Sequence, residues 1–351
     1  MDFKIKDLNC PVPVDDKSRI LLAHGSGGAH MHKLLDKVIL PKLMSKQLAY
    51  NHDSAVLNIE NTKLAFTTDS YVVDPLFFPG GDIGSLSVYG TVNDLAMSGA
   101  KALYISVAFI LEEGFAIADL ERVLASMQAA ASLVGVEIVT GDTKVVERGK
   151  GHGLYINTAG IGVVKHNVII RPDQIQIGDL IIVNGDIGRH GIAVMAHREG
   201  LQFETTITSD SASVNHIIER LLAENITIHC LRDVTRGGLA TTLNELAASS
   251  NTHIKLNEVA IPVQEEVGNA CELLGLDVLH VACEGRFVAF IPESEAVRAL
   301  EIMRSCQHGS TAQVIGVVAK DNSFNGVTMT NCIGVSRIVD KLSGEQLPRI
   351  C

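Results

Sequence analysis

The sequence lacks several features by which protein classes are usually recognised. It has no tryptophan, and only 4% of its 351 residues are aromatic. No apolar run approaches the roughly 18 residues that a membrane-spanning helix needs, and the first residues contain no apolar signal-peptide core. Its seven cysteines form no C-x-x-C pair, which argues against zinc fingers and thioredoxin-type sites. Because an odd, widely spaced set of cysteines favours reduced thiols, we predict a cytoplasmic protein without a membrane segment.

Positive charge is also scarce in this chain. Lys and Arg total 29 and Asp and Glu total 40, so the formal charge is −11. An acidic surface repels phosphate backbones, and nucleic-acid binding is therefore not expected. A single nucleotide is not excluded, because a metal ion can mask its phosphate charge. The length predicts about two domains, since domains average about 150 residues.

Short apolar runs alternate with amphipathic segments in both halves of the chain, which predicts an α/β or α+β fold. Strands are expected at 64–68, 102–110, 136–140, 157–164, 178–184, 278–282, 286–291 and 313–318. Helices are expected at 34–43, 85–100, 117–134, 191–199, 211–224, 238–249 and 294–306. The pattern of apolar and polar residues changes near residue 170, and this divides the chain into predicted domains at 1–168 and 169–340. Residues 341–351 are expected to form a tail without regular structure.

Five aspartates stand at predicted strand ends or in loops rich in small residues. They are Asp53, Asp69, Asp94, Asp142 and Asp233. Taken singly, an aspartate in such a position is more often a turn or cap residue. Magnesium binds a few carboxylates together with phosphate oxygens and water, so several converging aspartates would form a suitable site. Their joint occurrence with glycine loops and basic residues favours a magnesium–nucleotide site.

Other segments supply candidate contacts to phosphate and to protons. The loop Gly25-Ser26-Gly27-Gly28 precedes a predicted helix, and its N–H groups either cradle phosphate or only form a flexible turn. It matches neither the phosphate-loop nor the Rossmann signature. Lys144 and Arg236 are candidates to contact phosphate, with surface ion pairs as the alternative. Glu284, at a break between two predicted strands, is either a general base or a hairpin residue. A second glycine loop at 185–191 binds an anion or permits a tight turn.

The cysteine at the end of the sequence, Cys351, is the most unusual residue. The neighbouring terminal carboxylate disfavours a thiolate, so this thiol is a poor self-activated nucleophile. It is a better candidate for a carrier thiol that another protein loads. Eleven extended residues reach about 36 Å, enough to visit a partner and then the chain's own cleft. The alternative is an incidental cysteine in a frayed end.

Several motifs resemble the ATP-binding motifs of the aminoimidazole ribonucleotide synthetase-like superfamily. They are Thr67-Thr68-Asp69-Ser70, Val92-Asn93-Asp94-Leu95-Ala96-Met97-Ser98-Gly99-Ala100 and Gly141-Asp142-Thr143-Lys144. Within that superfamily, four stretches resemble the HypE family of hydrogenase-maturation carbamoyl dehydratases. They are His24-Gly25-Ser26-Gly27-Gly28, the segment 77–84, the segment 232–238 and the ending Pro348-Arg349-Ile350-Cys351. The ending is the most specific of these.

The resemblance implies a homodimer of two-domain α/β chains, with the N-terminal-domain sheets meeting at the dimer interface. In that family the carbamoyltransferase HypF loads a carbamoyl group onto the terminal thiol. ATP-dependent dehydration then gives a thiocyanate, and the cyano group passes to the HypC–HypD complex for the iron of [NiFe]-hydrogenase. The implied cofactors are ATP and Mg²⁺, with the five aspartates toward the metal and the glycine loop, Asn93, Thr143 and Lys144 toward the nucleotide. The resemblance makes Cys351 the residue that carries the carbamoyl group. The chemistry also needs positive charge at the transferring phosphoryl group, for which Lys144 and Arg236 are candidates, and a base, for which Glu284 is the candidate.

Two other classes of function remain open at this stage. The first is a small-molecule kinase or synthetase of the same superfamily, such as thiamine-phosphate kinase or selenophosphate synthetase. The latter is expected to carry a Gly-Cys-x-x-Lys segment, whereas Cys10 lies in Asn9-Cys10-Pro11. Neither activity explains a terminal thiol. The second is a non-enzymatic carrier that binds nucleotide without turning it over.

Overall fold

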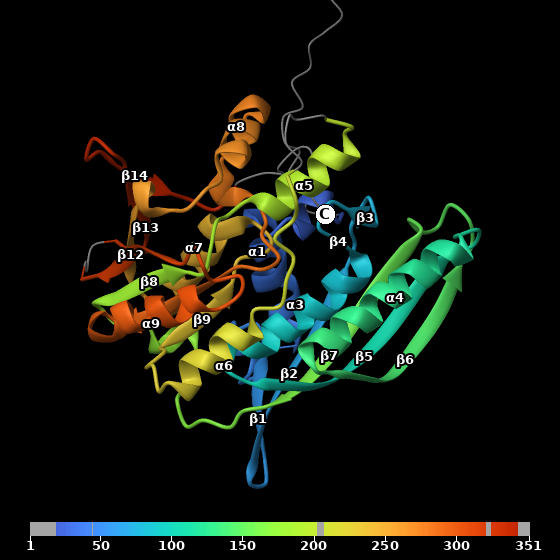
Figure 1. The fold of residues 1–351 in the computed structure, drawn as a ribbon, viewed down its shortest axis with the longest axis horizontal. Coiled ribbons are helices and arrows are strands. Elements are labelled where there is room, and N and C mark those ends of the chain that lie inside the picture. Colours follow the sequence, from blue (N-terminus) through green and yellow to red (C-terminus); the bar gives the residue numbers. More distant parts are fainter. Residues whose placement is uncertain (1–18, 44, 202–206, 321–323, 343–351) are drawn as a thin grey trace, which may run out of the picture.

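The computed structural model describes residues 19–43, 45–201, 207–320 and 324–342, which form two mixed sheets with their helices (Figure 1). The first half contains α1 (Ala29–Leu34), α2 (Leu40–Leu43), β1 (Ala55–Ile59), β2 (Thr62–Tyr71), β3 (Phe77–Phe78), β4 (Gly81–Asp82), α3 (Ile83–Met97), β5 (Lys101–Glu112), α4 (Ile117–Val134), β6 (Glu137–Val146) and β7 (Leu154–Val163). The second half contains β8 (Asp179–Val183), α5 (Arg189–Arg198), α6 (Asn215–Ala223), β9 (Cys230–Asp233), α7 (Gly238–Ser250), β10 (His253–Asn257), α8 (Glu265–Leu274), β11 (Phe287–Pro292), α9 (Glu293–Ser305), β12 (Gln313–Ala319), β13 (Gly326–Thr330) and β14 (Ser336–Val339).

The first sheet has the strand order β1-β2-β7-β5-β6, in which only β5 and β6 run parallel to each other. Successive side chains of a strand point to opposite faces, and β7 shows this alternation. Leu154 and Ile156 are buried in a core shared with α3 and α4. Ile161 lies on the opposite face, where it is substantially exposed together with Phe66 and Tyr104 of neighbouring strands.

Helix α3 joins the two halves. It begins where the Asp82 carboxylate accepts hydrogen bonds from the N–H groups of Gly84 and Ser85, satisfying donors that the first turn leaves unpaired. Gly84 allows a close approach to α4, because a Cβ there would collide with the carbonyl of Val123. The other end of α3 carries Met97 into a core with α6 and α9 of the second half. The helix therefore places its side chains at the junction between the two sheets.

The second sheet has the strand order β14-β13-β10-β12-β8-β11-β9. Strand β11 is buried on both faces, as a central strand covered by two layers of helices requires. Val288 and Phe290 pack into a core with α7, whereas Phe287 and Ile291 pack on the opposite side with α6 and α9. The edge strand β9 is followed by a short turn that leads into α7. The end of β9 and this turn supply several residues of the site described below.

Most predicted elements are observed, but one predicted strand is absent and two continue further than predicted. One of these two is β2, which reaches Tyr71, and the helix predicted from 211 begins at Asn215. Helix α4 has the predicted bounds, and the α/β architecture with two sheets agrees with the predicted fold class. Residues 278–282 are not a strand, because Val278–His280 forms a 3₁₀ turn. Strand β6 does not end at 140 but continues to Val146. The domain boundary at 168 stays a prediction. Among the described helices, none combines the length and the apolar character that crossing a lipid bilayer requires.

Candidate active site

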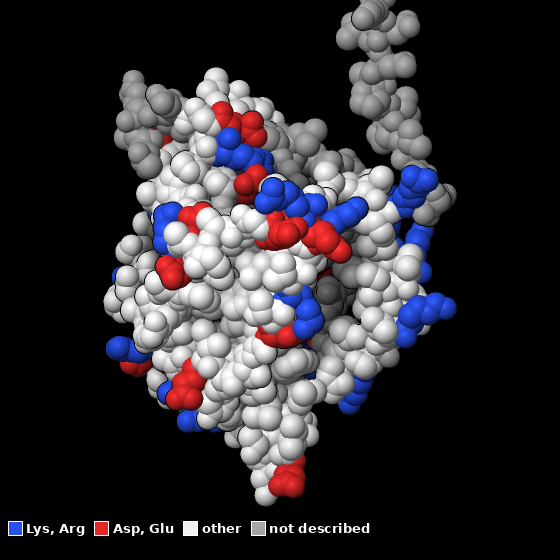
Figure 2. Space-filling model, turned by 90° about the vertical axis from the view of Figure 1, so that its right-hand side faces the viewer, with Lys and Arg blue, Asp and Glu red and all other residues white. Residues whose placement is uncertain are grey.

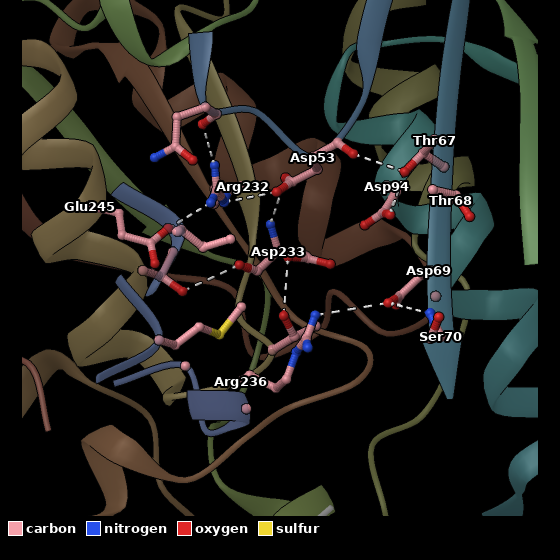
Figure 3. A pocket seen from close by; sticks show the side chains of 18 of the residues that line it. Asp53, Thr67, Thr68, Asp69, Ser70, Asp94, Arg232, Asp233, Arg236 and Glu245 are labelled. Atoms are coloured by element: carbon pink, nitrogen blue, oxygen red, sulfur yellow. Dashed lines mark hydrogen bonds and ion pairs between the residues drawn. The ribbon is translucent and has the colours of Figure 1, made fainter. Parts of the chain in front are cut away.

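A cavity of about 710 Å³ lies where β2 and α3 of the first half face β9 and α7 of the second half. This volume is in the range of small-molecule sites. Figure 3 shows residues 67–70 along β2 on one side and Arg232, Asp233 and Arg236 from the β9–α7 turn on the other. Each half of the chain supplies one wall, so neither half contains the complete site.

Four of the five predicted aspartates line this cavity. Asp53 precedes β1, Asp69 lies in β2, Asp94 lies in α3 and Asp233 ends β9. Their chain positions span 180 residues, so only the tertiary fold brings them together. The Thr67 hydroxyl, which donates to Asp94 at 2.8 Å, fixes the orientation of that carboxylate.

The electrostatics of these carboxylates indicate a cation site. Burial, reinforced by the neighbouring negative charges, raises the pKa of Asp94 well above its usual range. Burial raises the pKa of Asp53 in the same way, although the Arg232 guanidinium acts against it. Burial also raises the pKa of Asp233, to about 6. Buried like charges of this kind are stabilised when a cation binds between them.

The residues fit Mg²⁺ bound together with a phosphate group better than a metal held by protein alone. Within the described residues, no group of three or more His, Cys, Asp or Glu side chains could hold a metal ion by itself. Mg²⁺ usually takes only one or two carboxylates and completes its octahedron with waters and substrate phosphates. A cavity lined by dispersed carboxylates and a guanidinium matches that requirement.

Arg232 is the charged group that holds the two walls together. Its side chain is only 12% exposed; Nε lies 2.8 Å from the Asp53 carboxylate and Nη2 lies 2.6 Å from the Glu245 carboxylate. Nη1 donates to the carbonyl of Asn51 at 2.7 Å. The other oxygen of Glu245 lies 3.0 Å from Nε2 of His32. The guanidinium thus fixes the segment before β1 against β9 and α7 (Figure 3).

The glycine loop lies at the same cavity, although not with all four of its residues. Gly25 and Gly27 line it. Gly27 has a φ of +78°, and a Cβ there would lie 2.8 Å from the carbonyl oxygen of Arg236, so the loop packs directly on the β9–α7 turn. Ser26 instead donates to the carbonyl of Ala23, and Gly28 precedes the first turn of α1. Arg236 lines the cavity with its guanidinium 3.8 Å from the Asp69 carboxylate.

Glu284 also lines the cavity, in the turn before β11. Its backbone N–H donates to the Asp210 carboxylate at 3.2 Å. Burial raises the pKa of its side chain well above its usual range, and the nearby negative charges of Asp233 and Asp69 raise it further. A carboxyl group whose pKa is raised in this way is better suited than an ordinary glutamate to accept and return a proton.

The structure does not bring the remaining predicted residues to this cavity. Asp142, Thr143 and Lys144 lie on the exposed edge strand β6, where the Lys144 ammonium lies 2.7 Å from the Asp142 carboxylate. Asn93 is buried and bonds the backbone of Ala212 and Val214, so it ties α3 to the segment before α6. Cys351 lies outside the described residues.

Sequence reasoning missed several residues of the cavity wall. Arg232 and Glu245 form its central ion pairs, and Tyr71 and His190 line it as well. Arg232 stands beside Asp233 in a motif already singled out, and His190 belongs to the glycine loop at 185–191, which forms the tight turn before α5. Tyr71 and Glu245 are brought in by packing between distant elements.

Comparison with known proteins agrees with this architecture. The family model of the AIR synthase related protein N-terminal domain matches residues 51–164, and that of the C-terminal domain matches residues 176–328. The carbamoyl dehydratase HypE of Azotobacter vinelandii is 50% identical over 331 residues, covering 94% of this chain and 96% of that protein. A HypE solved in complex with ATP has a TM-score of 0.80 and 46% identity, covering 95% of this chain and all of that one. The crystal structure of a HypE–HypF complex has a TM-score of 0.83 and 44% identity, covering 88% of this chain and 99% of that one.

The two sheets and the acidic cavity between them define a two-domain protein of the AIR synthase related class. Identity at this level over nearly the whole length is more specific than the fold. The chain belongs to the HypE family of carbamoyl dehydratases, enzymes of hydrogenase maturation.

Proposed function

We propose that this chain uses ATP to dehydrate a carbamoyl group carried on the sulfur of Cys351, leaving a thiocyanate. The observation that carries this proposal is the cavity in which four aspartates, Arg236 and Glu284 converge. The similarity to a HypE solved with ATP supports the nucleotide, and the similarity to a HypE solved with HypF supports that protein as the source of the carbamoyl group.

One or two of the cavity aspartates Asp53, Asp69, Asp94 and Asp233 would hold Mg²⁺ together with the triphosphate oxygens, whose charge the metal would neutralise. The N–H groups of the loop around Gly25 and Gly27 would face the phosphates. Arg236 would stabilise the negative charge on the transferring phosphoryl group, since a positioned guanidinium acts most strongly where charge develops.

The chemistry requires a better leaving group than an amide oxygen. Attack of the carbamoyl oxygen on the γ-phosphate breaks its bond to ADP and makes that oxygen part of a phosphate ester. The nitrogen gives up one of its two protons to solvent as this imino-phosphate forms, and Glu284 would then accept the second. The electron pair of that N–H bond forms the third carbon–nitrogen bond, and the carbon–oxygen electron pair leaves with phosphate.

The rest of the assignment follows the same family pattern. We propose that the cyano group passes to the HypC–HypD complex and becomes a ligand of the [NiFe]-hydrogenase iron. The domains would divide at 168, with residues 1–168 for ATP binding and dimerisation, 169–340 as the second α/β domain and 341–351 as the tail that carries the thiol. A cytoplasmic location is consistent with the five described cysteines, all of which are free thiols.

Mass spectrometry of the tail peptide tests the proposal. The full chain is incubated with HypF, carbamoyl phosphate and ATP, and then receives fresh ATP. We expect a carbamoyl adduct on Cys351 that loses one water on the second addition. The other six cysteines serve as internal controls. A stable adduct that never loses water would exclude dehydration, and an adduct on another cysteine would exclude the carrier role of Cys351.

The same experiment separates the alternatives. A kinase of this superfamily would consume ATP with its small-molecule acceptor and without any adduct on the tail. A non-enzymatic carrier would bind ATP without adduct-dependent release of phosphate. Phosphate release that requires the carbamoylated tail would exclude both.

We also propose that the chain forms a homodimer through the outer face of its first sheet. Phe66, Ile161 and Tyr104 lie in register across β2, β7 and β5, and each is at least 40% exposed. Ile110, which alternates with the core-facing residues of β5 as Tyr104 does, is 43% exposed. Figure 2 faces the side on which β5 and β6 lie in Figure 1, and large parts of that surface carry no charged side chain. Exposed apolar side chains gathered on one face of a sheet are typical of protein interfaces.

In such a dimer, Asp142, Thr143 and Lys144 of β6 would reach the cavity of the partner copy, which would reconcile their predicted roles with their positions. Subunit mixing tests this arrangement. We expect Lys144→Ala and Asp94→Asn chains each to be inactive alone, but a refolded equal mixture to recover about a quarter of the wild-type activity, because half of the dimers would contain one intact site. A mixture as inactive as its components would place both residues in the same chain's site.

A further inference from the structure

His190 lies on the wall of the active-site cavity, and the chemistry proposed above leaves it without a role. It follows Arg189 in the first turn of α5, after a turn that Gly188 permits with a φ of +87°. His190 is only 1% exposed. A buried polar side chain on a cavity wall normally has a partner for each polar atom or a ligand to meet.

The imidazole ring is held firmly by residues of both halves. The Phe78 ring packs edge-on against it, with ring centres 5.3 Å apart. Nδ1 lies 2.9 Å from the hydroxyl of Ser209. The backbone N–H of Ser209 in turn donates to the carbonyl of Pro79 at 2.8 Å. Gly80, with a φ of +95°, permits this contact, because a Cβ there would lie 2.8 Å from the Ser209 nitrogen. The segment 77–84 therefore fixes the imidazole ring of His190, directly through Phe78 and indirectly through Ser209.

The hydrogen bonds around Ser209 accommodate a proton on Nε2 of this histidine. The Ser209 oxygen accepts the backbone N–H of Ser211 at 3.0 Å, and its own hydroxyl proton is available to donate to Nδ1. In that arrangement the ring carries its proton on Nε2. Burial lowers the pKa of His190 to about 4, so the ring is neutral at pH 7. Among the described residues, the hydrogen bond to Ser209 occupies Nδ1, and the residue lines the cavity.

His190 and Glu284 lie at the same end of the cavity. The N–H of Gly191, next to His190, donates to the carbonyl of Ala282 at 3.1 Å. Asp210, which follows Ser209, accepts the backbone N–H of Glu284 at 3.2 Å. Backbone contacts therefore bring the segments that carry the imidazole and the proposed base together, and both residues line the cavity that the aspartates also line.

We propose that His190 is a further catalytic residue, whose Nε2–H donates a hydrogen bond to the oxygen of the carbamoyl group as that oxygen leaves with phosphate. This inference rests on the proposed dehydration. Glu284 takes the proton from the nitrogen, and the carbon–oxygen electron pair moves onto the departing oxygen, where negative charge grows. A preorganised donor at that atom stabilises the transition state more than the bound substrate.

Two substitutions distinguish a donor from a packing residue. His190→Asn keeps an amide near the position of Nδ1, where it can still bond Ser209, but leaves the position of Nε2 without a donor. His190→Gln carries its amide N–H out to the position of Nε2. His197, exposed on the same helix, provides the control His197→Asn. The measurement is single-turnover water loss from chains preloaded with carbamoyl phosphate and HypF, with ATP affinity measured separately.

We expect His190→Asn to lower the rate constant for water loss by about 10²–10³-fold, His190→Gln to lower it by less than about tenfold, and His197→Asn to leave it unchanged. ATP affinity should change little in all three variants. An equal loss in both His190 variants, or a wild-type rate in His190→Asn, would overturn the donor role while wild-type turnover still supported the proposed function. A wild-type chain that never loses water would overturn the proposed function and this inference together.

Discussion

Replacing Glu284 with Gln is expected to lower the rate constant for water loss by about 10²–10⁴-fold, which is the usual contribution of a general base. Gln has nearly the same shape and still accepts hydrogen bonds, but its amide does not take up a proton under these conditions. Magnesium–ATP affinity should stay close to that of the wild type, because the aspartates and the glycine loop remain in place. The measurement is single-turnover water loss from the carbamoylated tail.

The fold gives Glu284 a fixed direction, which is why a single substitution should have so large an effect. Its neighbour Gly285 packs against Asp210 so closely that a Cβ would collide with the Asp210 carbonyl. The next residue, Arg286, lies 2.9 Å from the Asp186 carboxylate and 3.6 Å from the Asp210 carboxylate, and it is almost fully buried. The turn therefore cannot rotate without breaking buried ion pairs.

The pH dependence supplies an independent signature. Burial raises the pKa of Glu284, so the protonated, inactive form persists to a higher pH than for an ordinary glutamate. The rate of water loss should rise with pH through that raised pKa and then level off. In Glu284→Gln the residual rate should lack this rise, whereas the exposed control Glu293→Gln should retain it. A variant that keeps the wild-type pH profile would assign the base to another group.

The sequence predicted much of this site because several signals were local. Asp69, Asp94 and Asp233 stand in short motifs whose surroundings indicated strand ends or helices, although they come from two different sheets and a helix and Asp69 lies inside β2 rather than after it. The periodicity of 117–134 likewise predicted α4 to the residue. Where a pattern depends on neighbours within a few positions, the sequence contains the information.

Strand β6 shows where that reasoning fails. Gly141-Asp142 resembles a turn at the end of a strand, but the strand continues to Val146 in parallel register with β5. Gly141 is required there for packing, since a Cβ would collide with the carbonyl of Val107. A glycine needed for close strand contact and a glycine needed for a turn look the same in the sequence. Only the pairing with β5 distinguishes them.

The ion pairs around Arg232 could not be predicted from the sequence either. Asn51 and Arg232 are 181 positions apart, and Glu245 comes from a third element, so no local pattern links the three. Their importance follows from burial: a guanidinium out of water needs its charge and its donors matched by the fold. This network, rather than any single motif, holds the first aspartate of the site in place.

Arg232→Met should therefore lower the free energy of unfolding by about 3–5 kcal/mol, because removing one partner leaves the buried Asp53 and Glu245 carboxylates uncompensated. The matched control is Arg298→Met, which removes an arginine whose side chain is 59% exposed and pairs with Glu224. Its expected loss is about 0–1 kcal/mol, the usual value of a surface ion pair. Denaturant midpoints of the two variants, measured at one pH without nucleotide, provide the comparison.

A second substitution identifies the cause of the loss. If the cost comes from the stranded charge, Arg232→Met combined with Asp53→Asn should be more stable than Arg232→Met alone, since neutralising Asp53 removes part of the penalty. If the cost comes only from lost packing, Asp53→Asn should add its own loss to that of Arg232→Met. Equal midpoint shifts for Arg232→Met and Arg298→Met would show that the guanidinium does not hold the two walls of the cavity together.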